Sequence, residues 1–73
     1  MTNGTPEPTT WKDILDAALR KEKAAYRFYD EILRKTKVAV LRQLLETLRG
    51  EEAKHIDMIR NRKKIADMNL GRS

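Results

Sequence analysis

The residues of this sequence that could do chemistry are two glutamates and one histidine, each placed where a helical pattern calls for an apolar side chain. In the N-terminal half, apolar residues recur at alternating steps of four and three, which is the spacing of one face of a helix. Glu22 is the only charged residue on that face. The other members of this first seam are Trp11, Leu15, Ala18, Ala25, Tyr29 and Ile32.

The C-terminal half contains a second seam of the same kind, interrupted by Glu52 and His55. Residues three apart lie on the same face of a helix, so this carboxylate and this imidazole are neighbours. Carboxylate and imidazole are both groups that commonly bind metals in proteins. Together they suit iron or manganese and also accept zinc. The sequence has no cysteine, which excludes a thiolate metal site, an iron–sulfur cluster and a disulfide. The apolar members of the second seam are Leu41, Leu45, Leu48 and Ile59.

The first seam predicts a helix from about Trp11 to Arg34 or Lys35. Thr10 is a suitable N-cap, and Asp13 follows three residues later in the arrangement of a capping box. Opposite charges four residues apart stabilise such a helix by roughly 0.2–0.5 kcal/mol per pair. The pairs on this helix are Asp16–Arg20, Arg27–Glu31, Asp30–Arg34 and Glu31–Lys35.

A turn at residues 35–37 then leads into a second helix, which Thr36 is placed to cap. This helix is expected from about Lys37 to Asp67 or Met68. Gly50 lies inside it and costs about 1 kcal/mol relative to alanine, so a break at Gly50 is the alternative. One continuous helix is favoured, because the apolar spacing passes through Gly50 without a shift.

The expected domain organisation is a helical hairpin at residues 10–68, between an N-terminal tail at 1–9 and a C-terminal tail at 69–73. The first tail is rich in Gly, Pro and Thr, which predicts a disordered segment. No apolar run approaches the roughly 20 residues of a membrane span. The N-terminus also lacks the charged and apolar regions of a signal peptide. We therefore expect a cytoplasmic protein with no membrane partner.

The chain is basic, with 16 Lys and Arg residues against 11 Asp and Glu residues and a net charge of +5. The first interpretation is a solvated surface rich in cations. The alternative is an acidic partner, nucleic acid included. Because the basic residues are spread along both helices with no aromatic residues between them, no specific nucleic-acid partner is expected.

The two interrupted seams are expected to meet in an antiparallel hairpin with its turn at Thr36. At about 1.5 Å per residue, Glu22 lies roughly 21 Å before the turn and Glu52 roughly 24 Å after it, so both share one layer with His55. A two-helix hairpin leaves its apolar face exposed, so two copies are expected to pair about a two-fold axis as a four-helix bundle. Pairing gathers four carboxylates, whose mutual repulsion divalent or trivalent cations would relieve.

One glutamate on a first helix and Glu-x-x-His on the next form half of the ferritin-like di-iron pattern. The run Glu-Lys-Ala-Ala-Tyr-Arg-Phe-Tyr at residues 22–29 and the run Glu-Glu-Ala-Lys-His at residues 51–55 resemble the rubrerythrin branch of that family. Usual members carry the motif twice in one chain, whereas this chain carries it once, over about residues 11–65. In this respect it most resembles the encapsulated ferritins, two-helix proteins whose di-iron site forms between two subunits.

The resemblance implies a ferroxidase that oxidises Fe²⁺ with O₂ and serves iron storage or detoxification. It implies that Glu22, Glu52 and His55 are catalytic residues and the ligands of a di-iron centre, with Mn or Zn as substitutes. Glu22 and His55 would be terminal ligands, and Glu52 would bridge the two metals. Tyr29 matches a tyrosine that orients a ligand carboxylate, and Tyr26 is a weaker candidate for the same task.

The resemblance also implies particular partners. The chain is expected to form a homodimer and then a ring of dimers. The C-terminal Leu-Gly-Arg-Ser of residues 70–73 is partly like a peptide that targets cargo to an encapsulin shell, so the inside of an encapsulin nanocompartment is a candidate location. Glu51 is expected to face solvent, with a role in iron entry as the alternative.

Two other functions remain open from the sequence. One is rubrerythrin-like peroxide scavenging, which needs an external electron donor because the sequence has no cysteine. The other is a non-catalytic basic helical dimer that binds nucleic acid or an acidic protein, in which Glu22, Glu52 and His55 would only set the helix register. Bound metal would distinguish the ferroxidase and the peroxide scavenger from the non-catalytic dimer. A comparison of O₂ with H₂O₂ as the oxidant would then distinguish the two enzymes from each other.

Overall fold

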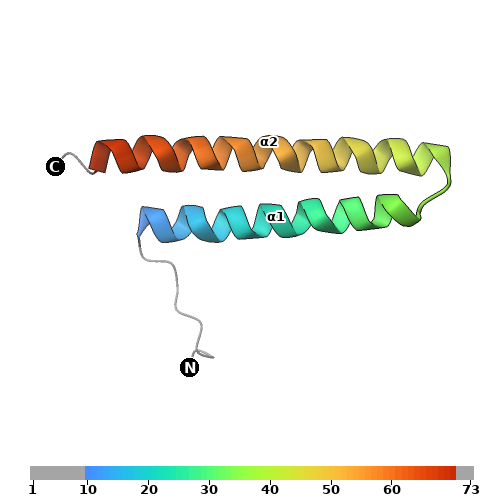
Figure 1. Cartoon of the computed structure of the whole chain (residues 1–73), viewed down its shortest axis with the longest axis horizontal. Coiled ribbons are helices and arrows are strands. Elements are labelled where there is room, and N and C mark those ends of the chain that lie inside the picture. Colours follow the sequence, from blue (N-terminus) through green and yellow to red (C-terminus); the bar gives the residue numbers. More distant parts are fainter. Residues whose placement is uncertain (1–9, 71–73) are drawn as a thin grey trace, which may run out of the picture.

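The structure is a computed structural model that describes residues 10–70, and these residues form two helices that lie side by side and antiparallel (Figure 1). Helix α1 spans Trp11–Lys35 and helix α2 spans Ala39–Leu70. The predicted all-α hairpin is confirmed, with no strand between residues 10 and 70. The predicted N-terminal tail at residues 1–9 lies outside the described residues.

Helix α1 begins where the sequence predicts. Thr10 is its N-cap, and its Oγ1 accepts a hydrogen bond of 3.1 Å from the backbone N–H of Asp13. This bond satisfies one of the amide groups that a helix N-terminus leaves without a partner. At the other end, Arg34 and Lys35 place positive charge in the last turn, where it interacts favourably with the helix dipole.

The turn differs from the prediction, because Thr36 caps the end of α1 and not the start of α2. Its hydroxyl donates to the carbonyl of Ile32 at 2.7 Å. The guanidinium of Arg42, on α2, donates from Nη1 to the carbonyls of Leu33 and Thr36 at 2.8 and 2.9 Å. A charged side chain from α2 therefore satisfies the last carbonyls of α1 and fixes how the second helix leaves the turn.

Helix α2 is continuous through Gly50, as predicted, but begins later and ends later than expected. It starts at Ala39 instead of Lys37, and its helical backbone continues to Leu70, which the sequence had placed in the C-terminal tail. A Cβ atom built at Gly50 would have nothing within 4 Å. A glycine permits a neighbouring helix to approach closely, but within one hairpin α1 does not approach Gly50 in this way.

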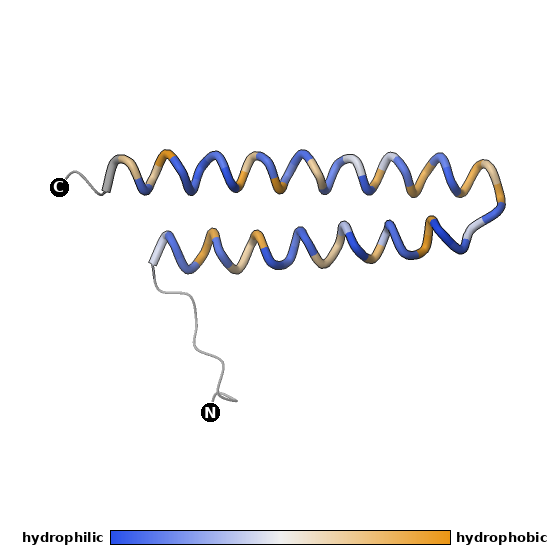
Figure 2. Tube along the Cα trace, in the orientation of Figure 1, coloured by the Kyte–Doolittle hydropathy of each residue, from blue (hydrophilic) through white to orange (hydrophobic). Residues whose placement is uncertain are grey.

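The hairpin by itself encloses very little core. Among the described residues, only Leu33 and Ile59 are buried hydrophobic side chains, with 4% and 9% of their surface exposed. Apolar residues follow both helices along their length (Figure 2). A single hairpin therefore leaves most of its apolar surface in water. The large hydrophobic side chains that stay exposed are Ile14, Phe28, Val38, Val40, Leu41, Leu44, Met58, Ile65 and Met68.

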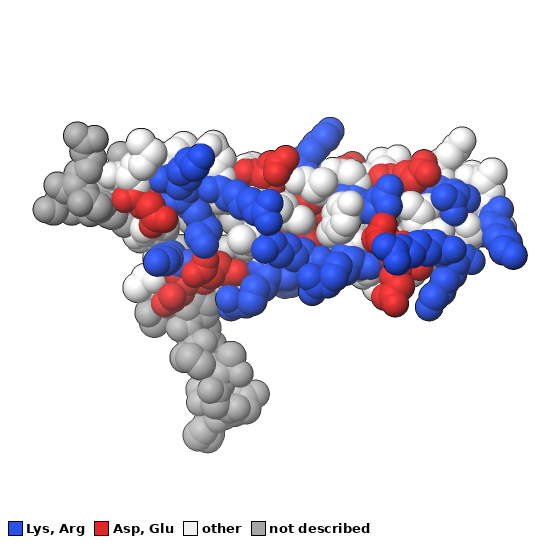
Figure 3. All heavy atoms as spheres, in the orientation of Figure 1, with Lys and Arg blue, Asp and Glu red and all other residues white. Residues whose placement is uncertain are grey.

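Basic side chains cover much of α1 on the face of the hairpin that Figure 3 shows. Figure 3 shows Lys and Arg in a nearly continuous band along α1. Arg20, Arg27 and Arg34 are exposed and stand two turns apart from one another, so they share one side of the helix. Arg27 lies about 140° around α1 from Glu22, so this side is turned away from the glutamate. Within the described residues, neither helix is long and apolar enough to cross a membrane.

Replacing Arg42 with alanine is predicted to destabilise the metal-free hairpin by about 1–3 kcal/mol, because two carbonyls at the end of α1 lose a charged donor. Urea unfolding followed by circular dichroism at a fixed protein concentration measures the change. The control is Gln43→Ala, at the next residue of α2, where the side chain is exposed. This substitution should change the free energy of unfolding by less than about 0.5 kcal/mol. Equal losses in the two variants would contradict the role of Arg42.

Candidate metal centre

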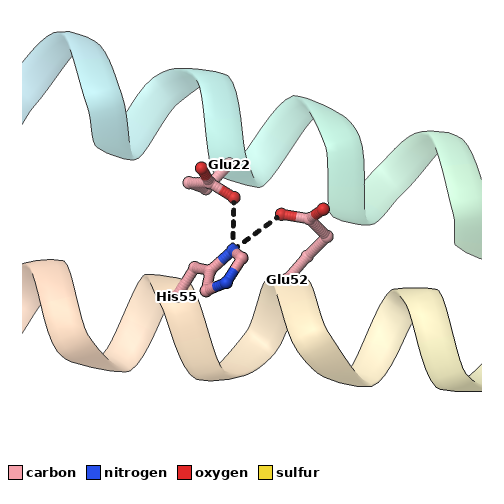
Figure 4. Close-up of side chains that lie close together, drawn as sticks. All are labelled: Glu22, Glu52 and His55. Atoms are coloured by element: carbon pink, nitrogen blue, oxygen red, sulfur yellow. Dashed lines mark hydrogen bonds and ion pairs between the residues drawn. The ribbon is translucent and has the colours of Figure 1, made fainter.

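The structure brings together the three polar residues that interrupt the two seams (Figure 4). Glu22 comes from the middle of α1, and Glu52 and His55 come from adjacent turns of α2. Nδ1 of His55 lies 3.2 Å from Oε1 of Glu22 and 3.4 Å from Oε1 of Glu52. One potential ligand atom from each residue can be chosen so that all lie within 4.8 Å of one another. Two carboxylates and one imidazole are therefore close enough to bind one cation.

Glu52 is the most enclosed of the three residues. Its side chain is 17% exposed, compared with 28% for Glu22 and 48% for His55. Oε1 of Glu52 is buried and has no hydrogen-bond partner, and its contact with Nδ1 of His55 is an ion pair of 3.4 Å. Buried polar atoms nearly always make a hydrogen bond, so a carboxylate oxygen that makes none calls for an explanation. A bound cation would satisfy it, and carboxylate and imidazole ligands fit iron.

The two carboxyl groups cannot both be ionised without cost. The pKa of Glu52 is raised, first by its interaction with the neighbouring Glu22 carboxyl and then by loss of hydration. The pKa of Glu22 is lowered, first by the same interaction and then by the imidazole of His55. The two carboxyl groups therefore titrate as a pair, and their proximity opposes the ionisation of both in the metal-free state. A cation between the two groups would relieve this opposition.

The imidazole of His55 is turned into the cluster through Nδ1 (Figure 4). Its pKa is raised, first by the hydrogen bond with Glu22 and further by Glu52, and partial loss of hydration opposes this only in part. The metal-free cluster therefore favours a protonated histidine. A metal ligand must be neutral imidazole, so metal binding here would release a proton.

Among the described residues, no hydrogen bond or ion pair joins the other predicted residues to the cluster. Tyr29 packs edge-to-face against Phe28, with ring centroids 5.4 Å apart, and no hydrogen bond joins it to the cluster within the described part of the chain. Its role in orienting a carboxylate stays a prediction. Tyr26 instead lies beneath the guanidinium of Arg49, 6.0 Å from the ring centre. Glu51 is exposed, as expected.

Two ion pairs between the helices were not foreseen from the sequence. Asp16, expected to pair with Arg20 on its own helix, pairs with Lys63 of α2, which lowers the pKa of Asp16. Asp30 pairs with Arg49 of α2 at 2.5 Å and also makes its predicted contact with Arg34, at 3.0 Å. The charge pattern within one helix gave no signal for these pairs, because they depend on how the helices are aligned.

The predicted titration of His55 follows from its contact with Glu22. His55 is the only histidine, so one NMR titration of the metal-free protein reports its pKa, expected above the ordinary value of 6.5. Stability from this contact is present below pH 6.5 and is lost as pH rises through the folded-state pKa. Glu22→Gln should move the pKa of His55 down and Glu51→Gln should leave it in place. Equal pKa values in the parent and Glu22→Gln proteins would contradict the assignment.

The comparisons with known proteins agree with the cluster. The family model for rubrerythrin matches residues 13–73, which include both helices beyond the first residues of α1. A comparison with curated proteins and one with solved structures gave no match. Since the family match covers most of the sequence, the chain belongs to the rubrerythrin family, a ferritin-like di-iron family whose members bind iron.

Proposed function

We propose that two copies of this chain form a di-iron ferroxidase, with the metal centre shared between two hairpins. The observation that carries this proposal is the buried Oε1 of Glu52, which accepts no hydrogen bond and lies beside Glu22 and His55. A di-iron centre in this family uses four glutamates and two histidines. One chain supplies half of that set, so a second copy would complete it.

The exposed apolar residues support pairing through the face that carries the cluster. Leu44 and His55 are about three turns apart and lie on the same side of α2. Met58, one turn beyond His55, is 51% exposed, and Leu44 is 53% exposed. Burying such side chains contributes roughly 25 cal/mol per Å² of apolar surface. Pairing on this side would therefore both stabilise the hairpins and bring two clusters together.

The roles proposed for the ligands follow from the position of each residue and from the family. Glu22 and His55 would each bind one iron, and the more enclosed Glu52 would bridge the two. Bound in this way, two Fe²⁺ ions can supply two electrons to O₂, which takes up two protons to form H₂O₂. The protein holds the ions in place and excludes water from the enclosed side of Glu52.

A second candidate is peroxide scavenging, which is as compatible with the rubrerythrin match as ferroxidase activity is. It uses the same residues and a different oxidant, so Fe²⁺ oxidation rates with H₂O₂ and with O₂ distinguish the two functions. The predicted delivery to an encapsulin shell rests on residues 70–73. Residues 71–73 lie outside the described part of the chain, so this partner stays a prediction.

Assembly is predicted to depend on metal. Without a cation, pairing would crowd four carboxylates together, which opposes the gain from apolar burial. Sedimentation velocity should show a larger species with Fe²⁺ under anaerobic conditions than after chelation. The Glu52→Ala variant should lose this response to metal. An oligomer that neither metal removal nor Glu52→Ala changes would contradict a metal-linked dimer.

Substitution of the ligands is predicted to slow Fe²⁺ oxidation in a fixed order. Glu52→Ala should be the most damaging, because it would remove a ligand from both metals, followed by His55→Ala and Glu22→Ala. Loss of a residue that only supports a metal ligand typically costs roughly 10- to 100-fold, so loss of a ligand itself is expected to cost at least that much. Glu51→Ala, at an exposed neighbouring position, is the matched control and should stay near the parent rate.

The measurement is the initial rate of Fe³⁺ formation under air, followed by absorbance, with helical content checked for each variant. Elemental analysis of protein purified without chelator gives the metal content in parallel. If Glu52→Ala and His55→Ala remain helical and oxidise Fe²⁺ at the parent rate, the cluster is not a ferroxidase centre.

A further inference from the structure

The two ion pairs between the helices stand on either side of the metal-ligand cluster. On α1, Asp16 precedes Glu22 and Asp30 follows it. On α2, Arg49 precedes Glu52 and Lys63 follows His55. Each pair joins an aspartate of α1 to a cation of α2. Along the helix axes, the cluster therefore lies between two ion pairs, each with its acidic residue on α1 and its basic residue on α2.

The two ion pairs also have the same axial alignment. The aspartates are about four turns apart on α1, and their partners are about four turns apart on α2. Both pairs are therefore satisfied together in one alignment of the antiparallel helices. Sliding α2 by one heptad would place Ile56 opposite Asp16 in one direction and opposite Asp30 in the other.

Apolar packing within one hairpin fixes this alignment weakly. Leu33 and Ile59 are the only buried hydrophobic residues in the described part of the chain. The seam recurs with alternating steps of four and three, so the apolar spacing alone would also accept a slide of one heptad. The short connection at 36–38 and the contacts of Arg42 oppose such a slide at the turn, which is the end of the hairpin far from Asp16 and Lys63. A slide of a single turn already moves one helix by about 5.4 Å, which separates Glu22 from its partners on α2.

The ion pairs are placed to oppose such a slide more strongly than fully exposed pairs would. The side chains of Asp16 and Lys63 are 34% and 26% exposed, and those of Asp30 and Arg49 are 23% and 31% exposed. Partial burial reduces screening by salt, and Asp30 is held from both sides by Arg34 and Arg49. Arg49 also covers the ring of Tyr26, which follows Glu22 by one turn.

We propose that Asp16–Lys63 and Asp30–Arg49 are positioning pairs that hold Glu22 level with Glu52 and His55 before the metal arrives. This inference rests on the proposed metal-binding function and adds residues that contact no metal. If only a fraction of the chains has the aligned helices, the apparent affinity for metal is the affinity of the aligned state multiplied by that fraction. If loss of one pair lowers the aligned population to about a tenth, metal affinity falls about tenfold.

The first measurement is the affinity for Co²⁺, a metal probe that can be titrated by absorbance without Fe²⁺ oxidation. Asp16→Lys sets two cations against each other and should weaken Co²⁺ binding by about tenfold. The double variant Asp16→Lys with Lys63→Asp restores an ion pair of reversed polarity and should recover most of that loss. Glu31→Lys is the matched control, because it makes the same charge change at an exposed position of α1 and should leave the affinity near the parent value.

The second measurement reports helix alignment without any metal. Because the sequence has no cysteine, spin labels can be placed at Ala24→Cys and Lys54→Cys, which are exposed on the two helices. Electron–electron distance measurements on labelled chains diluted with unlabelled chains should give one narrow distance in the parent protein. Asp16→Lys should broaden it or shift it by about one turn, roughly 5.4 Å, and the double variant should narrow it again.

These two measurements separate the positioning role from the metal function. A parent protein that does not bind Co²⁺ would overturn the proposed function, while the metal-free distances would still test the alignment. If Asp16→Lys keeps the narrow distance and the Co²⁺ affinity of Glu31→Lys, or if the double variant recovers neither property, the positioning role is wrong. Should Asp16→Lys lose its helical circular dichroism, the milder Asp16→Asn carries the same comparison.

Discussion

The structure depends on one unfavourable contact, the approach of the Glu22 and Glu52 carboxyl groups in a partly dehydrated layer. This proximity raises the pKa of Glu52 and lowers that of Glu22, which is how two neighbouring acids behave when the ionisation of one opposes that of the other. Apolar residues at these two seam positions would pack without that cost. Placing carboxylates there lowers the stability of the metal-free hairpin and creates a site that a cation can stabilise.

The contact also links metal binding to assembly. The cluster lies beside exposed hydrophobic residues, among them Leu44 and Met58. Covering these residues with a second hairpin would remove water from the cluster as well as from the apolar surface. The cost of ionised Glu22 and Glu52 would then rise as the hydrophobic gain increases. A cation that neutralises the carboxylates removes this cost of burying charge. Apolar burial and metal binding therefore favour the same assembled state.

Periodicity predicted the parts of this molecule that depend on local spacing. The two helices, the cap at Thr10 and the meeting of Glu22 with Glu52 and His55 all follow from seam positions and distances from the turn. The contacts of Arg42 and of Asp16 with Lys63 do not, because they depend on the stagger of two helices and on the reach of long side chains. The expected cap by Thr36 at the start of α2 is wrong for a related reason, because Thr36 caps the end of α1. A threonine hydroxyl in a short turn can form a hydrogen bond with the helix before it or with the helix after it. The contacts that Arg42 makes with the end of α1 depend on the folded turn, so the sequence alone does not show which helix Thr36 caps.

The cations around the cluster have two opposing effects on metal binding. Lys21 precedes Glu22 and contributes to lowering its pKa. A positive neighbour of this kind repels a free metal ion, which weakens the attraction at long range. At short range it favours the ionised form of Glu22, which is the form that binds a metal ion. The long-range repulsion is screened over about 8 Å at physiological salt, whereas the effect on the adjacent carboxylate is screened less. Lysine beside Glu22 is therefore compatible with a metal ligand, provided that the ion approaches from another side of the hairpin.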